Sequence, residues 1–487
     1  MVEKKGITII GLGPGDPNLL TRHAWEAIQA CPELYIRTAR HPVVPAISQS
    51  KHVVTFDHYY LEGNTFEAVY EKIVDQIIRL GTRPQGVVYA VPGHPFVAEA
   101  TSPEIVRRAH TLGIPVEIID GLSFFEPIFT ALELDPFPQI SLVDALELAA
   151  RHMPSFPTHT PVIIAQIHSR SIASDVKLNL MSLYPDEHPV KLVHAAGTTQ
   201  QKVESLALFE IDRSNLIGEL TSLYVPGLGL YTSFESFTEI IAHLRSPEGC
   251  PWDREQTHQS LRPHLLEETY EVLAALDRDD AESIQEELGD LLLQIVLHAQ
   301  IASEYGEFAI ADVLKGIHQK ILRRHPHVFG DIDIKDADGV VKNWELLKAA
   351  ERTMNGEEGK STLDGVALAL PALAQAEQYQ LRAARVGFDW PDVTGVMDKL
   401  LEEIAEVKEA PDWRSQFDEI GDLLFAIVNL ARWYRVDAES ALRQANERFR
   451  KRFYFIEEEA HAQGRSISDL TLSEMEKFWQ EAKQKND

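Results

Sequence analysis

Residues 265–272 read LLEETYEV and residues 286–296 read EELGDLLLQIV, and nearly the same order returns as LLEEIAEV at 400–407 and DEIGDLLFAIV at 418–428. Each copy sets carboxylates inside apolar runs, where an unpaired charge is costly. Around them, apolar residues recur at i, i+3, i+4 and i+7, which predicts amphipathic helices. The repeat therefore predicts that the chain is all-helical and internally duplicated from about residue 235 onward.

Within each copy the acids fall in pairs three residues apart, which places both members of a pair on one helical face. Two antiparallel helices joined by a short loop would bring the pairs together, and four carboxylates repel one another unless cations lie between them. Oxygen ligands favour Mg²⁺ or Mn²⁺ over zinc. The alternative, a solvated helix face with salt bridges, is disfavoured by the flanking leucines and the duplication. The candidate metal ligands are Glu268, Glu271, Glu287 and Asp290 in the first copy and Glu403, Glu406, Glu419 and Asp422 in the second.

The distance in sequence between the two acidic strings differs between the copies. Glu268 and Glu287 are 19 residues apart, whereas Glu403 and Glu419 are 16 apart. The spacing inside each string is unchanged. We therefore predict that the loop between the two helices changes by three residues while each helix keeps its own register.

Each copy ends in a basic helix. Lys320 and Arg324 are four residues apart on one face in the first copy, and Arg448 and Arg452 repeat this in the second. Cations beside a metal–carboxylate site suit a polyphosphate, because they neutralise oxygens that the metals leave free. The alternative is a helix C-terminus that carries basic residues to suit the helix dipole.

The helical half, from about Leu244 to the C-terminus, resembles the MazG family of all-α nucleoside triphosphate pyrophosphohydrolases. The resemblance is carried by the acidic strings together with GCPWDREQTH at 249–258, RRHPHVFGD at 323–331, VGFDW at 386–390 and ANERFRKRF at 445–453. It implies Mg²⁺-dependent hydrolysis of a nucleoside triphosphate to the monophosphate and diphosphate, on a dimeric helical scaffold.

The resemblance also implies roles for single residues. Glu267 and Glu402 would orient or deprotonate the attacking water, the eight acids would bind metal, and the basic helix ends would hold the distal phosphates. Where the family usually has lysine in its NxKFxxR string, this chain has Arg448, and arginine and lysine are not equivalent around phosphate. Trp252 and Trp390 are candidates for contacts to the base and sugar, with packing in the core or at a helix entry as the alternative.

The first part of the chain, to about residue 225, alternates strands with helices. GITIIGLG, GVVYAVPG and IPVEIID read as strands, with helical patterns between them. This alternation predicts an α/β domain with a largely parallel sheet and ligands at the carboxyl ends of its strands. VIIAQI at 162–167 and VKLVHAAG at 190–197 continue the pattern, and PGLG at 226–229 marks a candidate linker.

Glycine turns follow two of these strands. GLGPGDP at 11–17 is not the GxGxxG of a dinucleotide site, because Asp16 stands where that motif has glycine. Together with PGHP at 92–95 and GLSFFEPIFTALEL at 121–134, it resembles the tetrapyrrole (corrin/porphyrin) methylase family. That resemblance implies two α/β subdomains with S-adenosylmethionine in the cleft between them. The implied contacts are Gly11, Gly13, Pro14, Gly15, Asp16, Pro92, Gly93, His94 and Ser123.

The chain departs from the methylase pattern at PGHP, where many members have GDP with an acid. This puts methyl transfer in doubt more than the fold. We expect His94 to form hydrogen bonds within its loop rather than to act as a base.

Composition limits the remaining possibilities. A chain of 487 residues suggests two to four domains. It has no run of about 18 apolar residues and no signal-peptide pattern, so we expect neither a membrane span nor secretion. The two cysteines, Cys31 and Cys250, fit a reducing cytoplasm and form no thiolate zinc motif.

The net charge is −29, and residues 230–487 carry 50 acidic against 29 basic side chains. This argues against stable nucleic-acid binding, although solubility explains such a charge equally well.

Together these observations predict a methylase-like α/β domain at 1–225 and MazG-like helical domains at 240–352 and 361–487. The principal hypothesis is a Mg²⁺-dependent nucleoside triphosphate pyrophosphohydrolase that forms a homodimer through its helical region. The alternative is an S-adenosylmethionine-dependent methyltransferase whose helical half serves dimerisation or nucleotide sensing. A third, weaker reading is a module that senses nucleotides without turnover.

Overall fold

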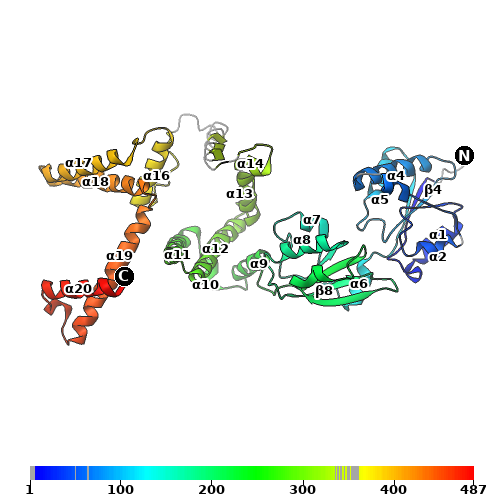
Figure 1. Ribbon diagram of the computed structural model, residues 1–487, viewed down its shortest axis with the longest axis horizontal. Helices are drawn as coiled ribbons and strands as arrows, with labels where there is room; N and C mark the ends of the chain where they lie inside the picture. Colours follow the sequence, from blue (N-terminus) through cyan, green and yellow to red (C-terminus); the bar gives the residue numbers. More distant parts are fainter. Residues whose placement is uncertain are drawn as a thin grey trace. The chain divides into compact units, whose positions relative to one another are not determined.

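The computed structural model describes residues 6–486, apart from residues 50, 63–64, 335, 337–338, 341–342, 345, 348–350 and 352–360. The chain divides into two compact units, Met1–Glu248 and Gly249–Asp487. The first unit combines strands with helices and the second is helical (Figure 1), which confirms the predicted fold class. Most of the joint predicted between the two helical copies, 353–365, lies outside the described residues. Within the described part of the chain, no helix is both long and apolar enough to cross a membrane.

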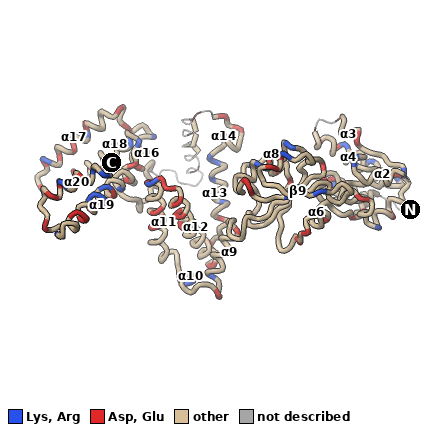
Figure 2. The backbone as a smooth tube through the Cα atoms, turned by 60° about the horizontal axis from the view of Figure 1, so that its bottom comes forward, with Lys and Arg blue, Asp and Glu red and all other residues tan. Residues whose placement is uncertain are grey.

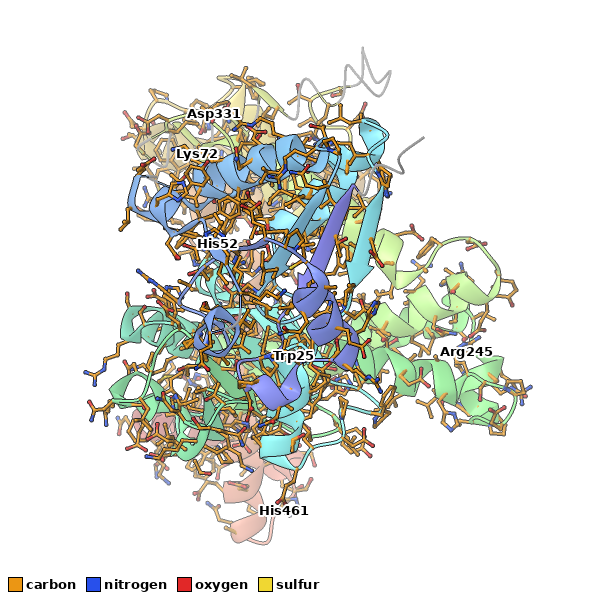
Figure 3. The ribbon with its side chains drawn as sticks, turned by 90° about the vertical axis from the view of Figure 1, so that its right-hand side faces the viewer. Trp25, His52, Lys72, Arg245, Asp331 and His461 are labelled. Carbon is orange, nitrogen blue, oxygen red and sulfur yellow. The ribbon has the colours of Figure 1, made fainter. Side chains whose placement is uncertain are left out.

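The first unit begins with a five-stranded parallel sheet in the order β3-β2-β4-β1-β5. Helices cover both of its faces, and Figure 3 labels Trp25 on α1 and Lys72 on α4, which belong to opposite faces. The strands are β1 (Ile7–Gly11), β2 (Leu34–Ile36), β3 (Val53–Thr55), β4 (Val87–Val91) and β5 (Val116–Ile119). The helices are η1 (Pro17–Leu19), α1 (Arg22–Ala30), α2 (Val44–Ser48), α3 (Asp57–Glu62), α4 (Phe66–Gly81) and α5 (Thr101–Thr111).

Alternation along β1 explains why this sheet is covered on both sides. Ile7 and Ile9 pack with Ile73 of α4 in one buried cluster, whereas Ile10 packs with Ile28 of α1 in another. Successive side chains of a strand point to opposite faces, so a strand that is apolar throughout needs helices on both. Because β1 pairs parallel with both β4 and β5, the carboxyl ends of these three strands lie at one edge of the sheet. The loops that follow them can form a binding site there.

The second sheet differs from the sequence expectation. Its order is β6-β7-β10-β8-β9, and only the β6–β7 pair is parallel, because β10 runs antiparallel to both β7 and β8 and β9 folds back on β8. The prediction that the parallel pattern continues here was wrong. The strands are β6 (Ser141–Asp144), β7 (Val162–Ala165), β8 (Pro189–His194), β9 (Lys202–Ala207) and β10 (Thr221–Val225), with helices α6 (Phe125–Leu132), α7 (Ala145–Ala149), α8 (Arg170–Leu180) and η2 (Leu208–Arg213).

The turn at 226–229 belongs to the first unit and packs against its residues 158 and 159. The Leu228 amide donates to the Thr158 carbonyl at 2.8 Å, and a Cβ added to Gly227 would lie 2.4 Å from the His159 carbonyl oxygen. Helix α9 (Phe234–Leu244) follows within the same unit. The division between the two units therefore falls after Glu248, about twenty residues beyond this turn.

The second unit repeats a helical hairpin. In the first copy, α11 and α12 pack side by side, and in the second copy α17 and α18 do the same (Figure 1). The first copy contains α10 (Pro251–Glu255), α11 (His258–Arg278), α12 (Ala281–Glu304), α13 (Ile310–Arg324) and α14 (Pro326–Phe329). The second contains α16 (Ala372–Arg385), α17 (Val393–Glu409), α18 (Trp413–Trp433), α19 (Ala438–Ala462), η3 (Ile467–Asp469) and α20 (Leu472–Asn486).

The three-residue difference between the copies does not lie in the loop, so that prediction was wrong. Helix α11 continues for seven residues after Glu271, whereas α17 continues for three after Glu406. The connecting loop is one residue shorter in the first copy, where only Asp279 and Asp280 join the helices. The first hairpin therefore gains about one helical turn, which is 3.6 residues, and loses one loop residue.

Candidate functional site

The hairpin of the first copy gathers three of its four predicted metal ligands. Glu268, Glu287 and Asp290 each offer a carboxylate oxygen, and these atoms lie within 4.8 Å of one another. Glu271 lies outside this set, but its charge is among the causes that raise the pKa of Glu268 and Glu287. Acidic residues gather on α11 and α12, whereas basic residues lie along α13 (Figure 2).

Partial burial and mutual repulsion disfavour the charged forms of these acids. The pKa of Glu268 is raised first by desolvation and then by the charges of Asp290 and Glu271. The pKa of Glu287 is raised for the same kinds of reason, with desolvation again the largest. A cation placed between the carboxylates would remove the repulsion, so the donor set fits a hard divalent ion.

The second copy also gathers three of its four predicted ligands. Oxygens of Glu403, Glu406 and Glu419 lie within 4.8 Å of one another. Asp422 lies outside this set but shares the wall of a cavity with Glu403. Glu403 is only 4% exposed, so its charge requires a close partner.

Lys399 is that partner, and the sequence argument missed it. Its Nζ lies 2.7 Å from Glu403 Oε1 and 2.9 Å from Glu402 Oε1, and the hydrogen bonds that it donates to these two carboxylates raise the pKa of Lys399. The first copy has His264 in this register, with Nδ1 3.6 Å from Glu267 Oε2. The signal was available, because Lys399 stands three and four residues before two of the acids.

The two predicted water-activating acids therefore sit next to basic side chains. Glu267 faces an imidazole and Glu402 faces an ammonium group, and both carboxylates are exposed. An exposed carboxylate beside a metal cluster can accept a proton from a water molecule.

The predicted phosphate-binding cations lie on α13 and α19 rather than on the acidic hairpins. Arg324 donates to both carboxylate oxygens of Glu351, with Nη2–Oε2 2.6 Å and Nε–Oε1 3.2 Å. These bonds from Arg324 contribute most to lowering the Glu351 pKa to about 2. Arg452 lies over the Trp479 ring, 5.7 Å from its centre. Lys320 lies within α13, and Arg448 lies within α19.

A cavity of about 700 Å³ adjoins the acids of the second copy. One part of its wall carries charge, from Lys399, Glu403 and Asp422. Another part carries the aromatic rings of Trp390 and Phe425. The size lies within the range of small-molecule sites. Trp390 is thus a cavity residue, whereas Trp252 is exposed and makes an edge contact with the His264 ring.

In the first unit, the predicted cofactor loops converge. Gly13 and Gly93 exchange backbone hydrogen bonds at 3.2 and 2.9 Å. A Cβ added to Gly11 would lie 2.5 Å from the Gly121 nitrogen and 2.6 Å from the Gly93 carbonyl oxygen. Because Gly11, Gly93 and Gly121 have no side chains, the ends of β1, β4 and β5 can approach one another closely. The loops after β1, β4 and β5 therefore form one continuous backbone surface.

The polar residues of these loops are engaged within the protein. His94 Nδ1 accepts a hydrogen bond from the Phe96 amide at 3.1 Å, and its Nε2 lies 3.5 Å from Asp120 Oδ1. Both ring nitrogens therefore have neighbours within the loops. Ser123, which is buried, donates to Glu126 at 2.5 Å and accepts from the Phe125 amide. The Asp16 carboxylate accepts from the Asn18 amide and caps η1.

A contribution from the second subdomain was also missed by the sequence argument. The Asp16 amide donates to the Gly197 carbonyl at 2.9 Å, and a Cβ added to Gly197 would lie 2.6 Å from the Pro14 ring. A Cβ added to Gly15 would likewise lie against the side chain of Thr198. The glycine turn is therefore shared between the two subdomains. The AAGTT string directly after a buried strand could have indicated this loop.

Comparisons with known proteins agree with the two units. The MazG nucleotide pyrophosphohydrolase domain matches residues 256–329, and the Tetrapyrrole (Corrin/Porphyrin) Methylases match residues 6–212. The Bacillus subtilis protein described as uncharacterized protein YabN is 43% identical over 487 residues, covering 98% of each chain.

Two further relatives each match part of the chain. The nucleoside triphosphate pyrophosphohydrolase/pyrophosphatase MazG of Thermotoga maritima is 46% identical over 250 residues, covering 51% of this chain and 95% of its own. A precorrin-4 C(11)-methyltransferase of Pseudomonas aeruginosa is 26% identical over 206 residues, covering 40% and 78%. The chain belongs to the MazG nucleotide pyrophosphohydrolase family and carries a tetrapyrrole methylase domain ahead of its helical half.

Proposed function

We propose that this protein hydrolyses nucleoside triphosphates to the monophosphate and diphosphate, using Mg²⁺ bound by its helical hairpins. The observation that carries the proposal is the cavity of about 700 Å³ beside the acids of the second copy. A nucleoside triphosphate has an anionic end and an aromatic end, and the wall of this cavity offers matching groups. The Thermotoga relative, named for this activity, supports the same reaction class.

The acids that would hold Mg²⁺ are Glu268, Glu271, Glu287 and Asp290 in one copy and Glu403, Glu406, Glu419 and Asp422 in the other. The raised pKa of Glu268, Glu287 and Glu406, each due first to desolvation, supports a site whose charges are relieved by a cation. When bound, the metal ions supply a Lewis acid for the phosphate and lower the pKa of a coordinated water.

The protein side chains perform the remaining steps. Glu402, exposed at the edge of the second cluster, orients the attacking water and accepts its proton, and Glu267 has the same role in the first copy. Lys399 is positioned to neutralise phosphate oxygens that face the cavity. Lys320, Arg324, Arg448 and Arg452 are proposed to reach the distal phosphates from the neighbouring basic helices.

The second copy is the better supported turnover site. Its acids adjoin the cavity, and Lys399 adds a cation where the first copy has His264. In the first copy, Glu351 forms ion pairs with Arg323 and Arg324, with Arg–Glu distances of 2.7 and 2.6 Å. These pairs compete with any phosphate for the same guanidinium groups. We therefore propose that the second copy carries most of the hydrolysis.

A homodimer through the helical unit belongs to the same proposal. Helix α12 exposes Leu288, Leu292 and Ile295, and α18 exposes Ile420, Leu424 and Ile427 at the corresponding positions. Three apolar residues spaced i, i+4 and i+7 form a stripe of the kind that packs against another helix. The repetition of this stripe in both copies supports a symmetric partner rather than chance exposure.

The test is a turnover assay with chromatographic separation of the products. We expect the wild-type chain with ATP and Mg²⁺ to release AMP and diphosphate. Glu406→Gln should remove most of the activity, Glu271→Gln should remove little, and the double variant should remove all of it. Glu409→Gln, an exposed acid on the same helix as Glu406, is the matched control. Full activity in the double variant, or ADP and phosphate as products, would contradict the proposal.

A second function is supported by the convergent glycine loops of the first unit. S-adenosylmethionine, if bound, would supply a methyl group, and the backbone of Gly11, Gly13, Gly15 and Gly93 would approach it closely with help from Pro14, Asp16, Pro92, His94 and Ser123. The packed loops offer backbone donors and acceptors without side-chain obstruction. In this reading the helical half serves dimerisation or nucleotide sensing.

A further inference from the structure

We infer that the segment Gly387–Trp390 forms the base-binding wall of the nucleotide cavity in the second copy, with Phe388 stacking on the base and Arg432 acting as its positioning residue. The inference rests on the proposed function and assigns the part of the substrate that this segment recognises. Neither Phe388 nor Arg432 was predicted as a site residue from the sequence.

Phe388 lines the cavity and yet is 82% exposed. A phenylalanine ring left in water forgoes the burial of a large apolar surface. A planar base that lies on the ring would remove this cost, and every nucleobase offers a face for stacking. The charged part of the same wall, with Lys399 and Glu403, suits the phosphate end of the substrate. The two kinds of wall fit the two ends of one nucleotide.

The segment that carries Phe388 is fixed by its neighbours on both sides. Gly387 has φ +86°, a conformation that suits glycine at the start of the turn. The Trp390 ring packs on Gly395, where an added Cβ would lie 2.7 Å from Cε3 of the ring. A larger residue at 395 would push the tryptophan off the start of α17. Phe388 is thus an exposed ring on a constrained loop.

Asp389 ties this loop to α18 through a bidentate ion pair. Arg432 Nη2 donates to Asp389 Oδ1 at 2.6 Å and Nη1 donates to Oδ2 at 2.9 Å. Arg432 also donates to Asn429 Oδ1 from Nε and Nη2, at 3.1 and 2.7 Å. Its side chain is only 12% exposed. A planar guanidinium held on two sides is a rigid anchor, so the position of Phe388 depends on Arg432.

The first copy lacks the arginine at this register. The position in α12 that corresponds to Arg432 is Gln300, whose Nε2 donates to Glu304 Oε1 of the same helix at 3.1 Å. The sequence Trp252-Asp253 in the first copy resembles Phe388-Asp389 in the second. Both copies therefore present an aromatic ring ahead of the first acidic helix, but only the second carries arginine at this position of its second acidic helix. Arg432→Gln places the residue of the first copy in the second.

The experiment measures kcat, KM and the ATP dissociation constant in the full chain carrying Glu271→Gln, so that only the second copy contributes. We expect Phe388→Ala to raise KM and the dissociation constant at least about fivefold, since stacking of a base on an aromatic side chain contributes about 1–3 kcal/mol, while kcat stays within about twofold. Inorganic tripolyphosphate, which has no base, should inhibit wild type and variant equally. Values for ATP within twofold of wild type would overturn the inference.

Arg432→Gln should weaken ATP binding in the same direction, and combining it with Phe388→Ala should add little, because both changes act on one ring. Arg432→Lys should restore part of the loss. Arg414→Gln, which removes an exposed ion pair with Asp418 on the same helix, is the matched control. Fully additive effects, or a loss confined to kcat, would contradict the positioning role.

Two further outcomes separate the inference from its alternatives. A variant Phe388→Ala that weakens self-association, measured by light scattering, without changing ATP binding would assign the ring to a second copy of the chain. A wild-type chain without turnover would contradict the proposed function, while the ATP dissociation constant of Phe388→Ala would still decide the base contact.

Discussion

A buried neutral histidine supports the glycine turn of the first unit. His41 Nε2 lies 3.0 Å from the Gly13 carbonyl oxygen, and because a carbonyl oxygen only accepts, Nε2 carries the hydrogen. The other nitrogen, Nδ1, is buried and has no hydrogen-bond partner among the described residues. Burial, with a further contribution from Arg37, lowers the pKa of His41 to about 4. Protonation would therefore place an unpaired charge beside an arginine.

This arrangement predicts that acid destabilises the first unit. The unfolded chain protonates His41 near pH 6.5 and the folded chain near pH 4, so the stability present above pH 6.5 is lost as the pH falls toward 4. The expected loss between pH 6.5 and 5 is about 2 kcal/mol, at about 1.4 kcal/mol for each pH unit. Urea unfolding at several pH values measures it. His41→Gln should flatten this dependence, whereas His152→Gln, at an exposed position, should leave it unchanged.

At the residue scale, the sequence predicted which kinds of side chain form the candidate metal sites better than it predicted how these side chains are arranged. Six of the eight proposed ligands do meet in the two clusters, because spacing of three on a helix fixes a common face. Glu271 and Asp422 stand apart, since the rotamers and the crossing of the helices are not encoded in spacing. Lys399 was missed because only the acids of this string were considered as site residues. The burial of Glu403, which makes this partner necessary, becomes visible only when the hairpin is packed.

At the element scale, regular patterns were predictable and compensating changes were not. The periodicity around Glu268 and Glu403 correctly predicted paired helices. The extra turn of α11 was assigned to the loop, because a helix that grows by a turn while its loop loses a residue has the same net length change. The antiparallel pairing of β9 and of β10 with their neighbouring strands was not predicted. The alternation of strands with helices indicates parallel pairing and gives no information about neighbouring strands that pair antiparallel.

The exposed stripes on α12 and α18 predict the oligomeric state. Leu424→Lys places a charge where an apolar partner would pack, and Leu292→Lys does the same in the first copy. We expect either variant to weaken self-association about 100-fold, which corresponds to about 2.7 kcal/mol, with the helical content of the chain unchanged. Light scattering across a concentration series measures this. Leu61→Lys, at an exposed leucine of the first unit, is the control, and an unaffected assembly in both stripe variants would refute the interface.

At the scale of the whole molecule, the contacts divide the chain into two units with separate cores. Clusters around Ile9, Ile10 and Ile164 lie in the first unit, and one around Ile456 lies in the second. The division after Glu248 could not be predicted from composition, because the glycine-rich turn at 226–229 resembles a linker and yet packs against Thr158. Separate cores imply that each unit can unfold and bind ligand by itself.

The last prediction follows from this independence. Calorimetry of the full chain should show two unfolding transitions, and tryptophan fluorescence should follow mainly that of the second unit, since six of the seven tryptophans lie there. A ligand bound to one unit stabilises that unit alone, by about 2.7 kcal/mol at 100 times its dissociation constant. S-adenosylmethionine should therefore raise the midpoint temperature of the first unit's transition by several degrees, whereas methionine should not. If millimolar S-adenosylmethionine moves neither transition, the glycine loops retain the methylase fold without its cofactor, and the nucleotide chemistry of the helical unit becomes the only activity that the proposal assigns.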